Sequence, residues 1–175
     1  MTETVSETWP DDVFQVLLDH RIRQVAYVPD AGHARLITLC HGNNDMKTVV
    51  LTTEEEGVAL LAGAWLGGER GVLLMQSSGV GNCLNMLSLM HVCRMPLLIL
   101  VTMRGEWGEF NPWQVPMGQN AEKALTLAGV VTYPLEDIDS IKETVEAAAQ
   151  IAFEGPAATA VLISQRILGA KTFGK

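Results

Sequence analysis

Short apolar runs alternate with longer segments of helical periodicity along this chain, and the alternation predicts its elements. Two runs, at residues 71–75 and 97–102, are continuously apolar, as expected for strands that are covered on both faces. Taken with the other runs of strand-like length, they predict six strands, over residues 24–28, 48–51, 71–75, 97–102, 130–133 and 159–163.

The segments between these runs predict helices. Pro10, Asp11 and Asp12 suit a first helical turn, because proline needs no hydrogen-bond partner there and acids complement the helix dipole. Gly67 and Gly68 suit the end of another helix. One predicted helix begins at Pro10, and another runs from Thr53 to Gly67. The others cover residues 34–40, 82–93, 121–127 and 138–152.

Strands and helices that alternate in this way predict a parallel sheet with helices on both faces. We therefore expect an α/β fold, a three-layer sandwich with a six-stranded, mostly parallel sheet in a flavodoxin-like arrangement. Ligands of such sheets bind beyond the carboxyl ends of the strands. The turns after Val28, Leu51, Met75 and Thr102 should therefore share one edge, here called the rim.

Composition limits the partners of the domain. Only 18% of the 175 residues are charged and 48% are hydrophobic, which favours burial of part of the surface in a larger assembly. The net charge of −8 argues against nucleic acid and membranes as partners. Three cysteines without paired or metal-ligand spacing indicate a cytoplasmic location and no metal site. We find no signal peptide pattern, and the run at 97–101 is too short to span a bilayer.

Three consecutive glutamates follow Thr53 at a predicted helix start. Thr53 and Glu56 have the spacing of a capping box, in which each side chain satisfies a backbone N–H of the other. From spacing alone, the simpler interpretation is that all three acids complement the helix dipole. Because the cap occupies Glu56, however, Glu55 is expected to point along the rim toward a partner.

Residues 78–81, Ser-Gly-Val-Gly, follow a predicted strand and open a predicted helix. Glycine permits a tight turn and the close approach of another group. Leu84 stands where a dinucleotide fingerprint needs a third glycine, and Met75 where a nucleophile elbow needs its first. On its own this turn is more often structural than catalytic.

Two further features lie near the rim. Of the four histidines only His33, which follows the turn at Pro29 and Asp30, has a position suited to ligand binding. Residues 103–118 form a long loop dense in polar and aromatic residues, and such loops are commonly functional. Its tryptophans are equally consistent with a subunit contact.

Five motifs carry a resemblance to a known family. They are Val-Pro-Asp at 28–30, Glu-Glu-Glu-Gly at 54–57, Met-Gln-Ser-Ser-Gly-Val-Gly-Asn at 75–82, Arg-Gly at 104–105 and Gln-Val-Pro-Met-Gly at 114–118. In this order, over nearly the whole chain, they resemble the pyrimidine-binding domain of thiamine diphosphate-dependent 2-oxoacid decarboxylases, in particular the sulfopyruvate and phosphonopyruvate decarboxylases. The resemblance implies one pyrimidine-binding domain over residues 1–175, with flexible ends at 1–8 and 170–175.

The resemblance also implies roles for individual residues. Glu55 falls on the catalytic glutamate, whose carboxylate hydrogen-bonds a pyrimidine ring nitrogen of the cofactor and so promotes loss of the thiazolium C2 proton. His33 and Arg104 are assigned, from their place near the rim, to hold an acid group of the substrate. The residues expected to line the pyrimidine pocket or the substrate mouth are Pro29, Asp30, Val80, Asn82 and Gln114.

One departure from the family concerns the diphosphate site. Complete enzymes of this kind carry Gly-Asp-Gly and a later asparagine, which bind magnesium and diphosphate, and here no aspartate stands between glycines. We therefore expect a β subunit to supply Mg²⁺ and diphosphate binding, with the active site formed where the subunits of a hetero-oligomer meet. A smaller departure is Val80, where many relatives have proline or leucine.

The expected function is that of an α subunit of a heteromeric thiamine diphosphate-dependent decarboxylase, a carboxy-lyase that is active only with its β subunit. Sulfopyruvate or phosphonopyruvate is the expected small 2-oxoacid substrate. Two alternatives stay open: a carboligase or lyase subunit that uses the same cofactor, and a non-catalytic binding subunit in which Glu55 only caps a helix.

Overall fold

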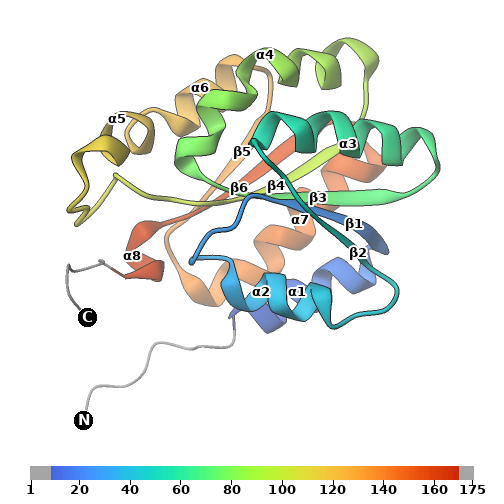
Figure 1. Cartoon of the computed structure of the whole chain (residues 1–175), viewed down its shortest axis with the longest axis horizontal. Helices are drawn as coiled ribbons and strands as arrows, with labels where there is room; N and C mark the ends of the chain where they lie inside the picture. Colours follow the sequence, from blue (N-terminus) through green and yellow to red (C-terminus); the bar gives the residue numbers. More distant parts are fainter. Residues whose placement is uncertain (1–8, 170–175) are drawn as a thin grey trace.

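A six-stranded sheet forms the centre of the protein, which is described here from a computed structural model over residues 9–169. Every strand pair is parallel, and the strand order is β2-β1-β3-β4-β6-β5 (Figure 1). The strands are β1 (Ile22–Tyr27), β2 (Lys47–Val50), β3 (Arg70–Gln76), β4 (Leu97–Thr102), β5 (Val131–Leu135) and β6 (Ala158–Ile163).

Helices cover both faces of the sheet (Figure 1). On one face lie α1 (Trp9–Asp19), α2 (Ala34–His41) and α7 (Ile141–Glu154), and on the other α3 (Glu54–Leu66), α4 (Ser77–Cys93) and α6 (Ala121–Leu127). The remaining elements are single turns, namely η1 (Pro112–Gln114), α5 (Val115–Gly118), η2 (Ile138–Ser140) and α8 (Gln165–Leu168).

The predicted three-layer α/β sandwich is confirmed, with a sheet that is parallel throughout. All six strands occur within two residues of their predicted bounds. The prediction was wrong at residues 77–81, because α4 begins at Ser77 and takes in the glycines that were expected to form a turn. Two short elements inside the long loop, η1 and α5, and the four-residue α8 leave too few periodic positions to be recognised in a sequence. The expected flexible ends, 1–8 and 170–175, lie outside the described residues.

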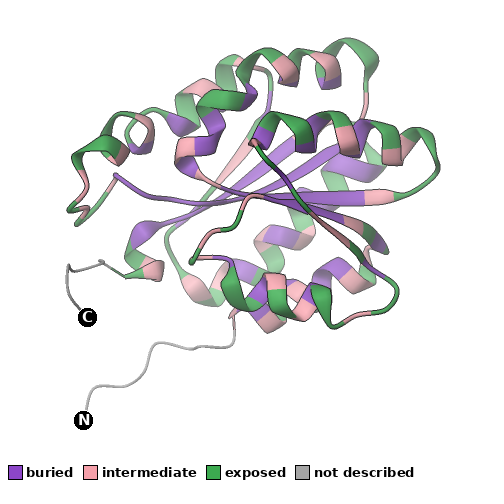
Figure 2. Cartoon of the chain, in the orientation of Figure 1, coloured by how far each residue is buried: buried purple, intermediate pink, exposed green. Residues whose placement is uncertain are grey.

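The apolar core has two parts, one on each side of the sheet, with the strands between them (Figure 2). Every residue of β4 is buried, as is every interior residue of β3, which accounts for their continuously apolar sequences. The edge strand β2 is only partly covered. Within residues 9–169, no helix combines the length and hydropathy that crossing a bilayer would require.

Helices α3 and α4 differ from the helices on the opposite face in their outer surfaces. After Glu56, neither α3 nor α4 contains an aspartate, glutamate, lysine or arginine, whereas α7 carries four. A helix that is apolar or uncharged all round is typical of a buried position. The layer formed by α3 and α4 is therefore the part of the surface best suited to cover by another protein.

Helix α3 also approaches the sheet closely through a glycine in its first turns. A Cβ atom on Gly57 would lie 2.5 Å from Cδ1 of Leu73 and 2.8 Å from Cδ1 of Leu51, both of which are buried. The missing side chain lets the start of α3 lie directly against β3. This close packing fixes where the acidic first turn of α3 meets the rim.

Two alanine substitutions on α3 test this packing. Gly57→Ala should lower the free energy of unfolding by about 1–3 kcal/mol, because the methyl group forces buried leucines to move. Gly63→Ala, where a Cβ would meet nothing within 4 Å, should raise it by about 0.5–1 kcal/mol through helix propensity and lower unfolded-state entropy. Urea denaturation of both variants measures the difference, and equal effects would contradict the close approach.

Candidate active site at the carboxyl rim

The rim side chains converge where the strand order reverses. From β1 the chain turns outward to β2 and then returns through α3 to β3, on the other side of β1. In open α/β sheets this reversal opens a crevice in which ligands bind. Asp30, Gln76 and Thr102 lie at or just after the ends of β1, β3 and β4, and so border this crevice.

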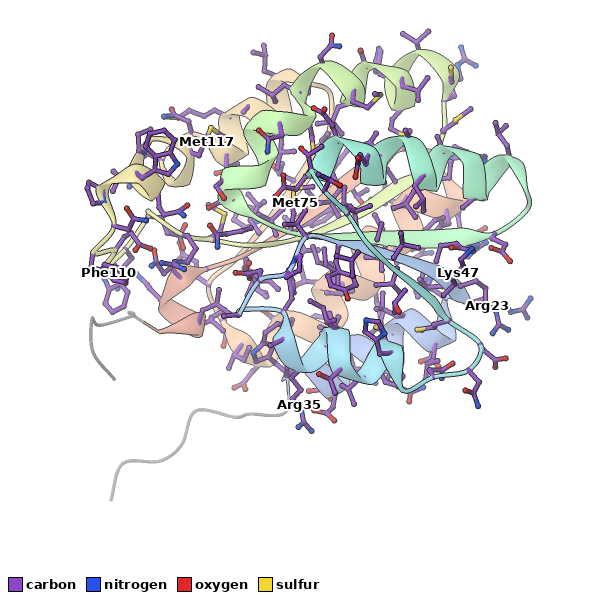
Figure 3. The ribbon with its side chains drawn as sticks, in the orientation of Figure 1. Arg23, Arg35, Lys47, Met75, Phe110 and Met117 are labelled. Carbon is purple, nitrogen blue, oxygen red and sulfur yellow. The ribbon has the colours of Figure 1, made fainter. Side chains whose placement is uncertain are left out.

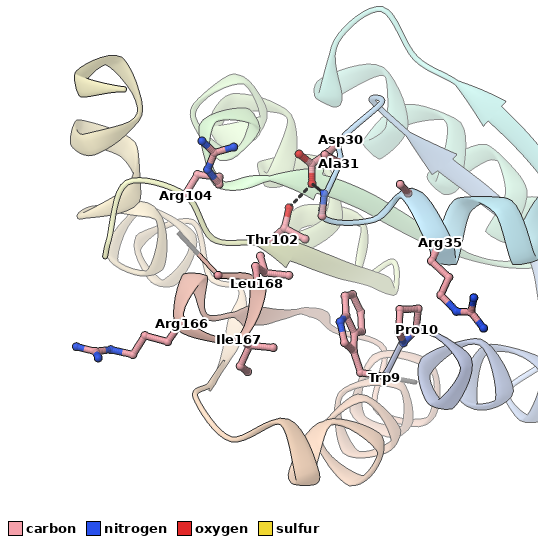
Figure 4. Close-up of a pocket in the computed structure, with 13 residues that line it drawn as sticks. Trp9, Pro10, Asp30, Ala31, Arg35, Thr102, Arg104, Arg166, Ile167 and Leu168 are labelled. Atoms are coloured by element: carbon pink, nitrogen blue, oxygen red, sulfur yellow. Dashed lines mark hydrogen bonds between the residues drawn. The ribbon is translucent and has the colours of Figure 1, made fainter. Parts of the chain in front are cut away.

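Asp30 is the hub of a hydrogen-bond network that joins these three strand ends. Its Oδ2 accepts from Thr102 Oγ1 at 2.7 Å and from the Gly32 backbone N–H at 2.9 Å (Figure 4). Its Oδ1 accepts from Gln76 Nε2 at 3.0 Å. Burial alone would raise the pKa of Asp30, but the bonds from Thr102 and Gln76 outweigh it, so the pKa lies below its usual value. Ser78 Oγ extends the network by donating to Gln76 Oε1 at 2.9 Å.

The acidic first turn of α3 lies next to the first turns of α4. Glu54 is 8% exposed, and its Oε2 accepts a hydrogen bond from Asn82 Nδ2 at 2.8 Å. A Cβ on Gly79 would lie 2.5 Å from Glu54 Oε1, so only glycine leaves room for this carboxylate. Glu54 is thus a nearly buried acid, held on one oxygen, between two helix starts at the rim.

Its two neighbours are arranged differently. Glu55 is exposed, and no residue of the described chain donates a hydrogen bond to its carboxylate. Glu56 Oε2 accepts from the Thr52 backbone N–H at 2.8 Å, whereas the Thr53 side chain makes no capping bond. The predicted capping box is therefore wrong: Glu56 does reach back to the chain before the helix, but to Thr52 instead of Thr53.

His33 does not lie on the surface of the rim, so the expectation behind its substrate role is wrong. The side chain is fully buried at the start of α2, with Nε2 3.1 Å from the Leu100 carbonyl oxygen and Nδ1 without a partner. Burial lowers the pKa of the imidazole despite the nearby Asp30 charge. A neutral, buried imidazole is not suited to bind an acid group from solvent.

Arg104 is close to the rim but already holds an anion. Its Nε and Nη2 donate to the two carboxylate oxygens of Glu109 at 2.7 and 2.9 Å, in a largely buried bidentate pair. Glu109 also accepts from the Asn111 backbone N–H and from Gln165 Nε2. This pair could not be predicted from the sequence, because residues five apart in an irregular loop have no characteristic periodicity.

The loop of residues 103–118 is anchored to the chain that follows β6. Gln165 Oε1 accepts from the backbone N–H groups of Gly105 at 2.9 Å and Trp107 at 3.2 Å. Glu106 Oε1 accepts from Ser164 Oγ and from the Gln165 backbone N–H. These bonds fold the loop over the carboxyl end of the sheet, where Figure 3 shows Phe110 and Met117, opposite Arg23 and Lys47 at the amino end.

The other predicted site residues have mixed positions. Pro29 is exposed just after β1, and Asn82 is exposed on α4 beside Glu54. Gln114 is half-buried in η1, and its Oε1 is a buried atom without a hydrogen-bond partner. Val80 is fully buried in the core, so its side chain does not line a pocket on the rim as expected.

Two cavities open beside these residues. One, of about 790 Å³, contains Asp30, Thr102 and Arg104 and extends toward α1 and α8 (Figure 4). The other, of about 530 Å³, is lined by Ser78, Gly81, Asn82, Trp113, Pro116 and Met117. Asn82 therefore stands between the Glu54 carboxylate and a cavity with a largely apolar wall, and Trp113 beside it is 84% exposed.

Comparison with known proteins adds the family. Residues 8–119 match the family described as "Thiamine pyrophosphate enzyme, N-terminal TPP binding domain". The chain belongs to this family. Thiamine pyrophosphate is another name for thiamine diphosphate. The matched residues include both the acidic start of α3 and the glycines of α4.

Relatives of this family member include subunits of decarboxylases. The chain is 31% identical over 152 residues to the sulfopyruvate decarboxylase subunit alpha of Methanococcus maripaludis, covering 86% of this chain and 91% of the relative. It is 34% identical to the corresponding subunit of Methanocaldococcus jannaschii, over 69% of this chain and 72% of the relative. It is 39% identical to the phosphonopyruvate decarboxylase of Streptomyces viridochromogenes, over 50% of this chain but only 22% of the relative.

A solved structure shares the fold. A 2-oxoglutarate:ferredoxin oxidoreductase from Magnetococcus marinus superimposes with a TM-score of 0.69 over 91% of this chain and 29% of its own, at 13% identity. At that identity the similarity concerns the fold alone. It agrees with the expected thiamine diphosphate-binding arrangement of six strands flanked by helices.

The residues of this thiamine pyrophosphate enzyme domain fit an aminopyrimidine ring. Glu54 offers a nearly buried carboxylate with one oxygen held by Asn82, and the missing side chain of Gly79 gives this carboxylate the space that it occupies. Gln114 adds a buried amide oxygen without a partner. Such a ring needs a group that can share a proton with a ring nitrogen, and room for a flat group. Glu54 is suited to the first task, and the cavity of about 530 Å³ beside Asn82 offers the room.

The Arg104–Glu109 pair gives a pH-dependent prediction. The hydrogen bond from Arg104 is the main cause that lowers the pKa of Glu109 from 4.5 to about 2. A carboxyl with a lowered folded-state pKa stabilises the fold above its unfolded value and loses that contribution as the pH falls toward the folded value. The difference in free energy of unfolding between the wild type and Glu109→Gln should therefore be largest above pH 5 and shrink between about pH 4.5 and 2.

Denaturation curves at a series of pH values measure this difference. Glu122→Gln, at an exposed position on α6, serves as the control for the same chemical change outside the ion pair. A difference for Glu109→Gln that stays constant over the same pH range would contradict the proposed cause.

Proposed function

We propose that this chain is the pyrimidine-binding subunit of a heteromeric thiamine diphosphate-dependent 2-oxoacid decarboxylase. We further propose that Glu54, not Glu55 as the sequence suggested, is the acid that meets the aminopyrimidine. The observation that carries the proposal is the nearly buried Glu54 carboxylate, held by Asn82 over Gly79, in a domain of the thiamine pyrophosphate enzyme family.

The difference in burial between the two glutamates supports Glu54 as the catalytic acid. A carboxylate that exchanges a proton with a bound ring works best where water is excluded and its position is fixed. Glu54 meets both requirements, whereas Glu55 is exposed and has no partner within residues 9–169. Glu55 would have a comparable environment only if another subunit packed directly over it.

Each residue near Glu54 has a proposed task. When bound, thiamine diphosphate supplies the carbon nucleophile and the electron sink for decarboxylation. Glu54 would hold the pyrimidine ring nitrogen through one shared proton, which its carboxylate can give up and take back. Asp30 is kept ionised by Thr102 and Gln76 and fixes the shape of the substrate side of the crevice. The exposed Pro29 and the unpartnered amide of Gln114 remain proposed cofactor contacts.

A β subunit is proposed to supply the diphosphate and Mg²⁺ site. The relatives from the methanogens are named as alpha subunits, which implies a partner in those proteins. The outer faces of α3 and α4, which carry no acidic or basic residue after Glu56, support the same proposal, because they border Glu54 and are suited to cover by protein. The catalytic pocket would then be completed at the contact between the two subunits.

Sulfopyruvate or phosphonopyruvate is the proposed substrate. The names of the relatives support these acids. Arg104 remains a candidate for the acid group of the substrate, but Glu109 already occupies its guanidinium, so an anionic substrate would have to replace Glu109. His33 is not part of this proposal, because its side chain is fully buried.

Purification from the native host tests the partner. The chain should co-purify with a polypeptide that carries the Gly-Asp-Gly and asparagine motif, and the mixture should release carbon dioxide from sulfopyruvate or phosphonopyruvate. Either chain alone should not. Release of a condensation product in the presence of an added aldehyde would instead identify a carboligase, and solitary elution would favour a non-catalytic subunit.

Substitution of the two glutamates tests the acid. In the reconstituted enzyme, Glu54→Gln should lower kcat by about 10²–10⁴-fold, because the amide retains the shape but cannot exchange the proton. The matched control Glu55→Gln should change kcat by less than about threefold, as expected for an exposed side chain. The reverse order of effects would return the catalytic role to Glu55 and remove Glu54 from it.

A further inference from the structure

We infer that Asn82 is a positioning residue for Glu54 and not, as the sequence suggested, a direct ligand of the cofactor. The inference rests on the proposed function, since it concerns how the acid of that site is held. Asn82 Nδ2 donates to Glu54 Oε2 at 2.8 Å, and no other residue of the described chain donates a hydrogen bond to this carboxylate. One asparagine therefore fixes its orientation.

The two residues belong to different helices whose starts are fixed independently. Glu54 is the first residue of α3, which Gly57 brings against β3 and Leu51. Asn82 lies one turn into α4, which follows directly from β3. Packing on the sheet fixes the backbones of both helices. The bond between the side chains therefore orients the carboxylate and is not needed to hold the helices together.

The bond also separates the roles of the two carboxylate oxygens. Oε2 is occupied by Asn82, so Oε1 is the oxygen left for a ring nitrogen. Gly79 packs against the carboxyl group as a whole, since a Cβ there would lie 2.5 Å from both Cγ and Oε1 of Glu54. Gly79 thus gives the carboxyl group the space that it occupies, while Asn82 holds one oxygen and leaves the other without a hydrogen bond from the described residues.

The chain offers matched controls for both residues. Asn85 is also an exposed asparagine on α4, but its side chain makes no hydrogen bond with the described residues. Gly63, on α3, is a position where a Cβ would meet nothing within 4 Å. These controls repeat the same chemical changes on α3 and α4 without touching Glu54 or lining the cavity beside Asn82.

The first test uses the whole chain without cofactor or partner. The free energies of unfolding of the wild type, Glu54→Ala, Asn82→Ala and the double variant form a thermodynamic cycle. The effects of the two substitutions should be non-additive, while Glu54→Ala combined with Asn85→Ala should be additive. Additive effects for the first pair would show that the bond does not form in solution and would overturn the inference.

The second test uses the reconstituted enzyme at saturating substrate. Asn82→Ala should lower kcat by about 10–100-fold, the usual result when a catalytic group is displaced by about an ångström, with a smaller change in the cofactor dissociation constant. In the Glu54→Gln background, Asn82→Ala should have almost no further effect on kcat, because Asn82 acts through Glu54. Gly79→Ala should lower kcat as well, whereas Gly63→Ala and Asn85→Ala should not.

The outcomes separate this inference from the proposed function. A large rise in the cofactor dissociation constant with unchanged kcat for Asn82→Ala would make Asn82 a direct ligand and overturn the inference. Full activity of Asn82→Ala beside an inactive Glu54→Gln would overturn it too, while the proposed function stands. Full activity of Glu54→Gln would instead overturn the proposed role of the acid itself.

Discussion

The meeting of the α3 and α4 starts at Glu54 is the contact on which the site depends. A carboxylate can be nearly buried there because Asn82 donates a hydrogen bond to it and because Gly79 has no side chain to displace it. Both conditions require α3 to lie close to the sheet. Gly57 allows this, because it has no side chain that would push the helix away from Leu73 and Leu51. A small number of glycines therefore sets the position of the acid more than any ion pair does.

The sequence was sufficient for the architecture, because parallel α/β folds leave strong local signals. The continuous apolar runs of β3 and β4 reflect strands covered on both faces, and the alternation of elements permits few other arrangements. The predicted bounds were least accurate at the start of α4. Its glycines were interpreted as a turn, whereas in the structure they serve the packing of the first helical turns. Sequence spacing does not distinguish these two uses of glycine.

The sequence singled out Glu55 in the acidic segment, whereas in the structure its neighbour Glu54 is the buried acid. Among three adjacent glutamates, the capping pattern singled out Glu56 and left no means to rank Glu54 against Glu55. That ranking depends on which residue faces α4, a tertiary contact across 28 positions of sequence. The buried His33 and the Arg104–Glu109 pair were missed for a related reason: proximity to the rim does not tell whether a side chain points to solvent. That Asp30, Gln76 and Thr102 meet at the ends of β1, β3 and β4 follows more directly from the parallel topology of the sheet.

The attachment of the long loop through Gln165 has a practical consequence. A single amide side chain, two residues past the last strand, bonds to Gly105, Trp107 and Glu109 and so supports the loop from below. Shortening the protein to the end of its sheet would thus leave every strand in place but release the loop from its base. Tags, fusions and proteolytic trimming near the carboxyl terminus should be designed to leave this glutamine and the turn around it intact.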